Sequence, residues 1–557
     1  MALRSQFFQV ALWATLASTS LSFPVSGPSI RLDGGTLVGI NNASVDEYLG
    51  VPYALPPTGH LRFQLPQPNT PYSGTINATA FGPSCPGTAS SSSTSSTNAS
   101  SSSASSLPPS ISAIFDILNG VGTTGPVSED CLTLNVFVPS GTTPDAKLPV
   151  VAWVFGGGFS TGSAIDYNGQ AVVKRSVELD EPLIYVSLNY RLSAFGFLSS
   201  KEVQEAGVGN LGLRDQRQAL RWIQNYIGAF GGDPEKVTIW GESAGSWSVA
   251  LQLLTNGGNP EGLFRAAFLE SGSPLPVGNI TQVQSTYDAL VADANCTGSA
   301  DTLQCLREVS FDNLQTAVAN ATGTLQQTQN LPWQPRVDGD FLPDMPMELV
   351  RKGNVANVPI INGDCEDEGT IFGLDATIAG VTVADNLTSW LPTILHGISE
   401  EDINSILEAY PDNVTLGSPF GTGTADAITP EYKRISALQG DLVFQAPRRY
   451  MLNELSAKQP MWSYLYTKGQ SATILGAAHS TDLSDIYGPG DMTDFLINFV
   501  NYLNPNNKTG LFWPQYNTTS RAMMTFLDGT PSVEITQDTF REEQISLMAT
   551  LGQKYPF

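Results

Sequence analysis

The chain has 557 residues, and 52 acidic against 27 basic side chains give it a formal net charge of −25. A charge this negative excludes nucleic acid and anionic membrane surfaces as favourable partners. After the N-terminus, no apolar stretch approaches the ~18 residues that a transmembrane helix needs, so we expect no membrane anchor.

Residues 1–22 have the features of a secretory signal peptide. Arg4 supplies a positive start, Phe7 to Leu16 an apolar stretch too short to span a bilayer, and residues 17–22 a cleavage region of small residues. We therefore expect a secreted, extracellular protein. The length alone would permit three or four domains, but we expect residues 23–557 to form one catalytic domain with long insertions.

Ten Asn-x-Ser/Thr sequons fit a glycosylated secreted protein, with the sequons in surface loops. Their asparagines are Asn42, Asn77, Asn98, Asn279, Asn295, Asn320, Asn386, Asn413, Asn507 and Asn517.

Five cysteines allow two disulfides in an oxidising compartment. Cys296 and Cys305 are near enough to close a small loop, Cys85 and Cys131 would then close a long one, and Cys365 would remain as a buried thiol. Spacing alone leaves this connectivity open. We find no Cys/His cluster with zinc spacing and expect no metal site.

The region 85–131 contains two unusual segments. Residues 88–106 are nearly all Ser, Thr and Ala, which predicts a flexible segment because they can bury little apolar surface. Residues 107–122 then predict a short helix, with one apolar face formed by Ile111, Ile114, Phe115 and Leu118. We interpret this helix as a mobile lid over an apolar active site. The alternative is a surface helix packed permanently on the core.

Apolar runs and helical patterns alternate through the rest of the chain. The helical pattern covers residues 216–229, and the expected buried strands are residues 150–155, 183–188, 236–240, 266–269, 358–361 and 462–466. This alternation predicts an α/β fold with a large, mostly parallel sheet covered on both faces.

Ser243 lies in the sequence Gly241-Glu242-Ser243-Ala244-Gly245, between an expected strand and an apolar helix at residues 246–254. Gly-x-Ser-x-Gly between strand and helix is the nucleophile elbow, whose tight turn leaves the serine hydroxyl exposed. The order of elements therefore predicts a serine hydrolase. The alternative is an ordinary Gly/Ser turn.

A nucleophilic serine needs a general base, and in this arrangement the base follows the serine in the chain. Of three histidines, His60 comes too early, and His396 fits a surface position at a helix end. His479 lies in a loop of small residues after an expected strand, where an imidazole has room to reach the serine. We identify His479 as the base.

The acid that orients this base is expected in the loop 362–370, after the strand 358–361. Its four carboxylates are Asp364, Glu366, Asp367 and Glu368. A loop at the carboxyl end of a sheet strand favours catalysis, whereas a charge run is also typical of a solvated turn. Spacing does not choose among the four.

Several motifs together resemble the type-B carboxylesterase/lipase family, from about residue 25 to the C-terminus. They are Ser128 to Val136, Asn189-Tyr190-Arg191, Gly209 to Gln216, Phe230 to Pro234, Val237 to Gly245 and Asp367-Glu368-Gly369. The resemblance implies an α/β-hydrolase fold with a Ser-Glu-His triad, in which the acid is Glu368. It also implies the disulfides Cys85–Cys131 and Cys296–Cys305.

The run Phe155-Gly156-Gly157-Gly158 follows an expected strand. By the same resemblance, the backbone N–H groups of Gly157, Gly158 and Ala244 form an oxyanion hole. A phosphate-binding loop is the alternative, but no Gly-Lys-Ser/Thr follows. Phe155 matches the fungal secreted branch of the family. No tryptophan lies between Cys85 and Cys131 to bind a choline cation, which makes choline esters poor candidates.

These residues predict a secreted carboxylic ester hydrolase that works through an acyl-enzyme and needs no cofactor. The resemblance to fungal lipases and sterol esterases implies hydrophobic esters and transient contact with a lipid interface. Alternatives are a carboxylesterase for small soluble esters and, more remotely, a non-catalytic adhesion protein on the same fold.

Overall fold

The computed structural model describes residues 27–87, 125–322, 331–471, 473–507 and 510–557. The expected signal peptide, residues 1–22, lies outside the described residues. So do the Ser-rich segment 88–106, the Asn98 sequon and the expected lid helix with Ile111, Ile114, Phe115 and Leu118.

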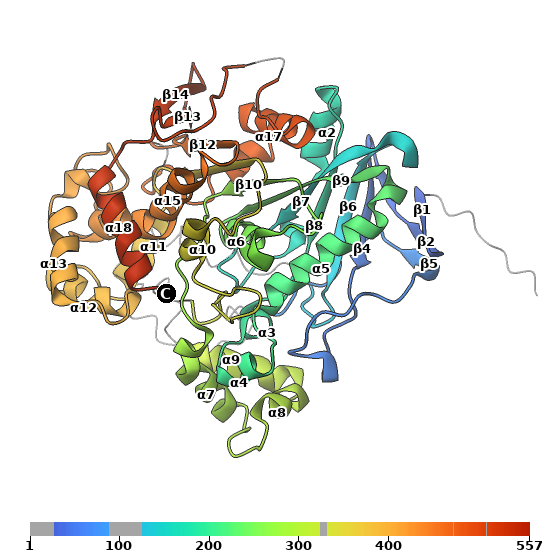
Figure 1. The fold of residues 1–557 in the computed structure, drawn as a ribbon, viewed down its shortest axis with the longest axis horizontal. Coiled ribbons are helices and arrows are strands. Elements are labelled where there is room, and N and C mark those ends of the chain that lie inside the picture. The colour runs from blue at the N-terminus through green and yellow to red at the C-terminus, as the bar shows by residue number, and fades with distance from the viewer. Residues whose placement is uncertain (1–26, 88–124, 323–330, 472, 508–509) are drawn as a thin grey trace, which may run out of the picture.

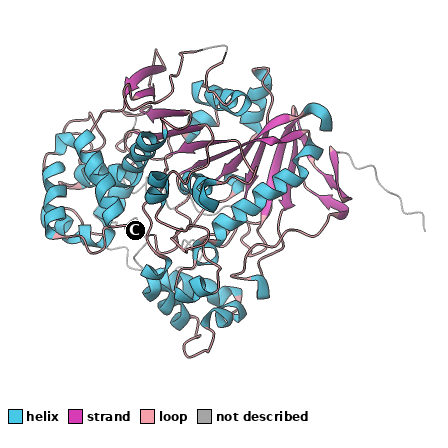
Figure 2. Ribbon diagram, viewed as in Figure 1, coloured by secondary structure: helices cyan, strands magenta, loops and turns pink. Residues whose placement is uncertain are grey.

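One twisted sheet of eleven strands forms the centre of the molecule (Figures 1 and 2). In spatial order the strands are β14 (Val533–Gln537), β13 (Ala522–Phe526), β12 (Met461–Tyr466), β11 (Ile360–Cys365), β10 (Ala266–Glu270), β9 (Gly232–Glu242), β7 (Leu148–Val154), β8 (Ile184–Leu188), β6 (Thr133–Pro139), β4 (Val45–Pro52) and β3 (Ile40–Asn42). The strands from β8 to β13 are parallel, and both edges are antiparallel. The expected parallel α/β sheet is thus confirmed.

Helices cover the sheet in two groups (Figure 1). The helices α2 (Gln170–Glu178) and α17 (Asp491–Tyr502) pack on each other and on strands of the sheet, while α5 (Leu211–Tyr226), α6 (Ala244–Gly258) and α15 (Ala446–Leu455) form the second group. The remaining helices are α3 (Ser193–Phe197), α4 (Lys201–Glu205), α7 (Gln284–Asp293), α8 (Thr302–Glu308), α9 (Phe311–Thr322), α10 (Pro346–Lys352), α11 (Thr370–Ile378), α12 (Ala384–Ile394), α13 (Glu400–Ala409), α14 (Tyr432–Gly440), α16 (Leu483–Ile486) and α18 (Glu542–Lys554).

A small separate sheet lies at the N-terminal end and was not expected from the sequence. Its strands are β1 (Ser29–Leu32), β2 (Gly34–Val38) and β5 (Ser73–Asn77). Only a few of their residues are buried, so they lack the continuous apolar runs that marked the central strands.

Several expected element boundaries were wrong, including those of one helix and one strand near the site. The helix predicted over 216–229 begins at Leu211, and a short 3₁₀ turn replaces its end. The strand predicted over 358–361 runs instead from Ile360 to Cys365, pairing with β12 as far as Tyr466. It continues through Asp364, whose buried carboxylate pairs with the Arg448 guanidinium at 3.0 Å.

Candidate active site

Ser243 occupies a strained turn at the carboxyl end of β9. Its φ and ψ are 56° and −126°, an unusual conformation for a residue with a side chain, and α6 begins at the next residue. A Cβ on Gly241 would lie 2.5 Å from the backbone of Gly245, and a Cβ on Gly245 would lie 2.0 Å from the Val154 carbonyl oxygen. Both glycines are therefore required by close approach of the backbone, as expected for a nucleophile elbow.

The structure brings Ser243, His479 and Glu368 together, although 236 and 111 positions separate the bonded pairs. His479 Nε2 is 2.8 Å from Ser243 Oγ, and His479 Nδ1 is 2.5 Å from Glu368 Oε2. All three side chains are at most 9% exposed. This geometry allows the imidazole to take the serine proton while the carboxylate stabilises the imidazolium.

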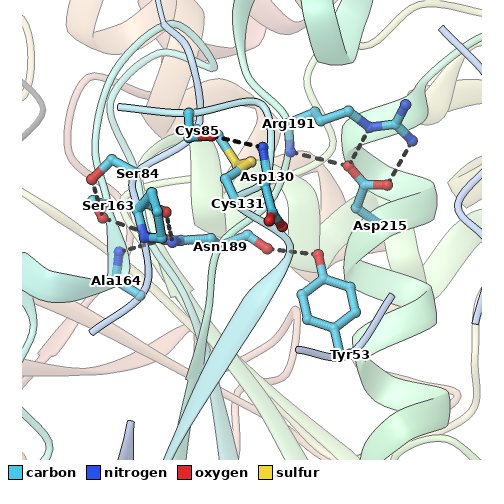
Figure 3. Close-up of a disulfide and its surroundings, with 12 residues drawn as sticks. Tyr53, Ser84, Cys85, Asp130, Cys131, Ser163, Ala164, Asn189, Arg191 and Asp215 are labelled. Atoms are coloured by element: carbon cyan, nitrogen blue, oxygen red, sulfur yellow. Dashed lines mark hydrogen bonds and ion pairs between the residues drawn. A yellow bond between two sulfur atoms is a disulfide. The ribbon is translucent and has the colours of Figure 1, made fainter. Parts of the chain in front are cut away.

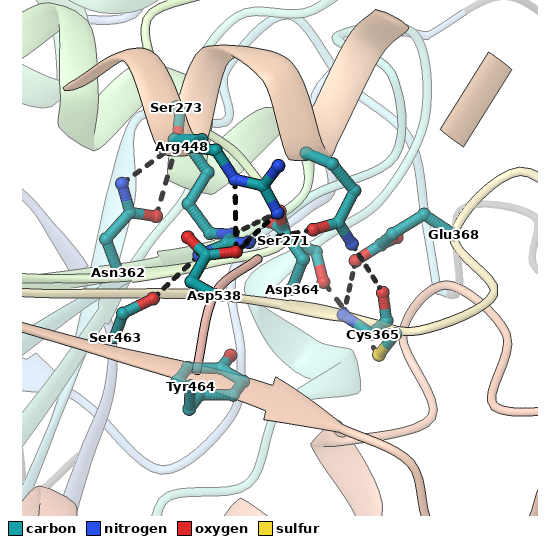
Figure 4. Close-up of polar contacts among 12 residues, drawn as sticks. Ser271, Ser273, Asn362, Asp364, Cys365, Glu368, Arg448, Ser463, Tyr464 and Asp538 are labelled. Carbon is teal, nitrogen blue, oxygen red and sulfur yellow. Dashed lines mark hydrogen bonds and ion pairs between the residues drawn. The ribbon is translucent and has the colours of Figure 1, made fainter. Parts of the chain in front are cut away.

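Glu368 is held from its other side by the end of β11 (Figure 4). The Cys365 backbone N–H donates to Glu368 Oε1 at 2.7 Å. Burial raises the pKa of Glu368 to about 8, although the Ser271 hydroxyl and this backbone N–H act to lower it. The ionised form of Glu368 is therefore stabilised most when a positive charge forms on His479.

The acidic run that contains Glu368 is not a solvated turn. Asp364, Asp367 and Glu368 are buried, and Glu366 is partly buried. Asp367 joins two loops, because its Oδ1 accepts from Phe420 N at 2.9 Å and its Oδ2 from Ala477 N at 3.0 Å. The Asp367 N–H donates in turn to the Ala477 carbonyl at 3.0 Å. Asp367 thus fixes the loop that carries His479 against the loop that carries Glu368.

The glycine loop after β7 packs directly against the serine. A Cβ on Gly156 would lie 2.8 Å from Ser243 Cβ, and Gly157 and Gly158 have φ values of +102° and +59°. The loop is anchored by Tyr190, whose hydroxyl donates to the Phe155 carbonyl at 2.8 Å and whose ring stacks on Phe155. Gly157 and Gly158 follow Gly156 in this loop, and Ala244 follows Ser243. The role of these three residues as oxyanion donors stays a prediction.

Asn189, next to Tyr190, connects this loop to the disulfide-closed region (Figure 3). Its Oδ1 accepts from Ala164 N at 2.9 Å, its Nδ2 donates to the Pro83 carbonyl at 3.0 Å, and its carbonyl accepts from the Tyr53 hydroxyl at 2.7 Å. The Asn-Tyr-Arg motif therefore joins three segments near the glycine loop.

The two expected disulfides, Cys85–Cys131 and Cys296–Cys305, are present with S–S distances of 2.01 and 2.04 Å. Cys365 is a buried free thiol, as predicted.

Aromatic rings form a wall beside the His479 imidazole, and sequence reasoning missed it. Phe444 and Phe372 lie 4.8 and 5.5 Å from the His479 ring, and Trp247 stacks on Phe444 at 5.6 Å. Phe159 of the glycine loop continues the row beyond Trp247. Phe444 belongs to a π-helical turn, Asp441–Gln445, between α14 and α15, a distortion frequent at functional sites. No apolar period in the sequence identifies this wall.

A second carboxylate, Glu242, also lies beside His479. Its Oε1 is 3.4 Å from His479 Nε2 and accepts a hydrogen bond from the Ser480 hydroxyl. Burial raises the pKa of Glu242 to about 7, although His479 and Ser480 act to lower it. The residue is a variable position of the elbow motif, so the motif gave no reason to select it.

The other two histidines lie away from this site. His60 is in a short 3₁₀ turn, and His396 follows the end of α12. Within the part of the chain that the structure describes, no three His, Cys, Asp or Glu residues gather as metal ligands. The described helices include none long and apolar enough to cross a bilayer.

Eight sequon asparagines have exposed side chains: Asn42, Asn77, Asn279, Asn295, Asn320, Asn386, Asn413 and Asn517. Asn507 is half-buried, and its amide donates to Glu181. Their glycosylation stays a prediction.

Known proteins similar to this chain agree on one family. The carboxylesterase family model matches residues 26–546. Lipase 4 of Diutina rugosa is 39% identical, over 91% of this chain and 93% of its own length. Lipase 1 of Geotrichum candidum is also 39% identical, over 89% and 91%. A secreted triacylglycerol lipase of Gibberella zeae is 35% identical, over 96% and 92%.

Among solved structures, the crystal structure of Aspergillus niger EstA superposes with a TM-score of 0.78. It is 27% identical in sequence, and the match covers 95% of this chain and 99% of that one. Together with the family match, this similarity confirms the α/β-hydrolase fold.

Proposed function

We propose a mechanism and a substrate class for this chain, which belongs to the carboxylesterase family and is a carboxylic ester hydrolase. The observation that carries the mechanism is the pair of contacts made by His479, 2.8 Å to Ser243 and 2.5 Å to Glu368.

In the first half of the reaction, Ser243 Oγ attacks the ester carbonyl carbon while His479 Nε2 takes its proton. The negative charge on the carbonyl oxygen is stabilised by N–H groups of Gly157, Gly158 and Ala244, each worth about 3 kcal/mol of barrier. His479 then protonates the leaving alkoxide, and an acyl ester remains on Ser243.

In the second half, His479 takes a proton from water, and the hydroxide attacks the acyl-enzyme. Collapse of the second tetrahedral intermediate releases the carboxylic acid, and Ser243 regains its proton from His479. Glu368 stabilises the imidazolium in both halves. Every proton is carried by His479, so this scheme uses no cofactor.

Hydrophobic esters are the proposed substrates. The aromatic wall of Phe372, Phe444 and Trp247 supports this class, because it makes the surroundings of His479 apolar and its partly exposed member, Phe372, can contact an acyl chain. The names of the similar fungal lipases support it as well. A preference for small soluble esters is the alternative.

Hydrolysis of p-nitrophenyl esters from acetate to palmitate, and of an emulsified triacylglycerol, separates the two classes. We expect kcat/KM to rise with acyl length and the emulsion to be hydrolysed. The Ser243→Ala variant should fold normally and lose the activity on every substrate. A maximum at acetate with no hydrolysis of the emulsion would assign the enzyme to small soluble esters instead.

Secretion is proposed from residues 1–22, with residues 23–557 as one glycosylated catalytic domain. The name of the secreted lipase of Gibberella zeae, the two disulfides and the exposed sequons support this proposal. Edman sequencing of protein recovered from the culture medium should begin at Phe23, and treatment with an N-glycosidase should lower its mass. A protein retained in the cells with Met1 intact and no change in mass would contradict it.

A further inference from the structure

A hollow of about 640 Å³ opens on one flank of the molecule, between the start of α2 and the short helix α16. Its volume is within the range of roughly 300–1,000 Å³ that small-molecule sites occupy. None of Ser243, Glu368 and His479 lines it. The lining residues are Asp166, Tyr167, Asn168, Gln170, Ala171, Lys174, Leu483, Ser484 and Tyr487.

Two of the residues that line this hollow are tyrosines whose rings pack against a buried aromatic layer. Tyr167 and Tyr487 lie 5.0 and 5.5 Å from the ring of the buried Trp153, and Tyr487 also stacks on Trp240 at 5.2 Å. The hydroxyls of Tyr487 and Tyr185 are 2.8 Å apart. These contacts restrain the orientation of the two rings.

The rim is polar and carries both signs of charge. It presents one carboxylate from Asp166, one ammonium from Lys174, and the amide and hydroxyl groups of Asn168, Gln170 and Ser484. The charges of Asp166 and Lys174 cancel. A phosphorylated or otherwise anionic ligand would also be repelled by the protein, whose net charge is −25. A neutral ligand with many hydroxyls fits best.

A pyranose sugar has this chemistry. Its C–H face is apolar and can lie on a tyrosine ring, while its hydroxyls both donate and accept hydrogen bonds. The amide of Gln170 is already oriented, because its Nε2 donates to Glu47 Oε1. Its side-chain oxygen accepts no hydrogen bond from the residues that the structure describes, and it can accept one from a sugar hydroxyl.

We propose that this hollow is a carbohydrate site that binds a neutral pyranose unit. The sugar would belong to a free oligosaccharide or to an N-linked glycan of the protein itself. An N-linked glycan on Asn42 would begin near the hollow. The exposed Asn42 lies in the hairpin of β3 and β4, and Glu47 of that hairpin contacts Gln170 at the rim.

To test the site, enzymatically deglycosylated protein is titrated with cellobiose and with mannobiose, and binding is monitored by saturation-transfer NMR. Ala171 is exposed and lines the hollow in the first turn of α2, so Ala171→Trp would fill it. Ala384 is exposed at the first position of α12, and Ala384→Trp is the matched control. Both variants should hydrolyse p-nitrophenyl butyrate at the wild-type rate, which reports an intact fold.

We expect saturable binding of at least one disaccharide by the deglycosylated wild type and by Ala384→Trp. For Ala171→Trp we expect a Kd raised about tenfold or more. Binding that appears only after deglycosylation or in Asn42→Gln supports the protein's own glycan as the ligand, and equal binding by the glycosylated protein supports a free oligosaccharide. No binding of either sugar, or equal binding by the two tryptophan variants, would overturn the proposal.

Discussion

At the residue scale, the position of the proposed nucleophile, Ser243, depends on its backbone conformation rather than on its own side chain. Ser243 adopts a positive φ between two glycines whose Cβ atoms would collide with neighbouring backbone. The Gly-x-Ser-x-Gly pattern encodes that requirement, so the sequence was sufficient to select Ser243. Glu368 was selected only through the family resemblance, because four carboxylates share its loop and spacing does not separate them.

Glu242 could not be selected from the sequence at all, since its importance comes from burial and from contacts with a loop more than 230 residues away. Its pKa is raised to about 7 by burial. A raised folded-state pKa favours the folded protein below the unfolded value of ~4.5, and this contribution is lost as pH rises through about 7.

We therefore predict that Glu242→Gln weakens the pH dependence of stability. The melting temperature of the wild type should fall more between pH 5 and 8 than that of Glu242→Gln, as measured by differential scanning fluorimetry. Glu543→Gln, on the exposed face of α18, is the control and should follow the wild type. Parallel curves for all three proteins would contradict this role for the buried carboxyl.

At the element scale, the end of β11 shows why strand boundaries were misjudged. An Asp within an apolar run normally predicts the end of a strand, yet Asp364 is buried inside β11 and pairs with Arg448. Arg448 also binds Asp538, which follows β14 (Figure 4). Arg449 binds the same carboxylate. The compensating charges come from distant segments, so no local pattern could predict them.

The same contacts predict a large effect of Asp538→Asn on stability. Burial would raise the pKa of Asp538, but the two arginines hold it at about 2. Removing this charge leaves Arg448 buried with less compensation, and breaking a buried pair typically costs about 3–5 kcal/mol. Asp538→Asn should therefore unfold at a lower urea concentration than the wild type at pH 7, by an amount that corresponds to this loss of about 3–5 kcal/mol.

Asp340→Asn is the matched control, because Asp340 is 75% exposed and pairs with Arg214 at the surface. Its effect should stay below about 1 kcal/mol. The difference between the variants should shrink as pH falls from about 4 towards 2, where Asp538 itself takes up a proton. Equal urea midpoints for the two variants at pH 7 would contradict a stabilising network.

At the scale of the whole molecule, the parallel sheet explains how remote residues meet. Ser243, Glu368 and His479 follow β9, β11 and β12, and the carboxyl ends of parallel strands lie at one edge of a sheet. Alternating apolar runs were sufficient to predict this sheet. They did not predict the small N-terminal sheet or the aromatic wall, because these depend on half-buried strands and on a π-helical turn between two helices.

The central claim is that Ser243 is the nucleophile activated by His479 and Glu368. Diethyl p-nitrophenyl phosphate reacts covalently with such a serine, so stoichiometric treatment followed by proteolysis and mass spectrometry tests the claim directly. We predict one diethylphosphoryl adduct, on the peptide that contains Ser243, in proportion to the lost esterase activity, and none in the His479→Ala variant. Complete inactivation with Ser243 unmodified, or with the adduct on another residue, would contradict it.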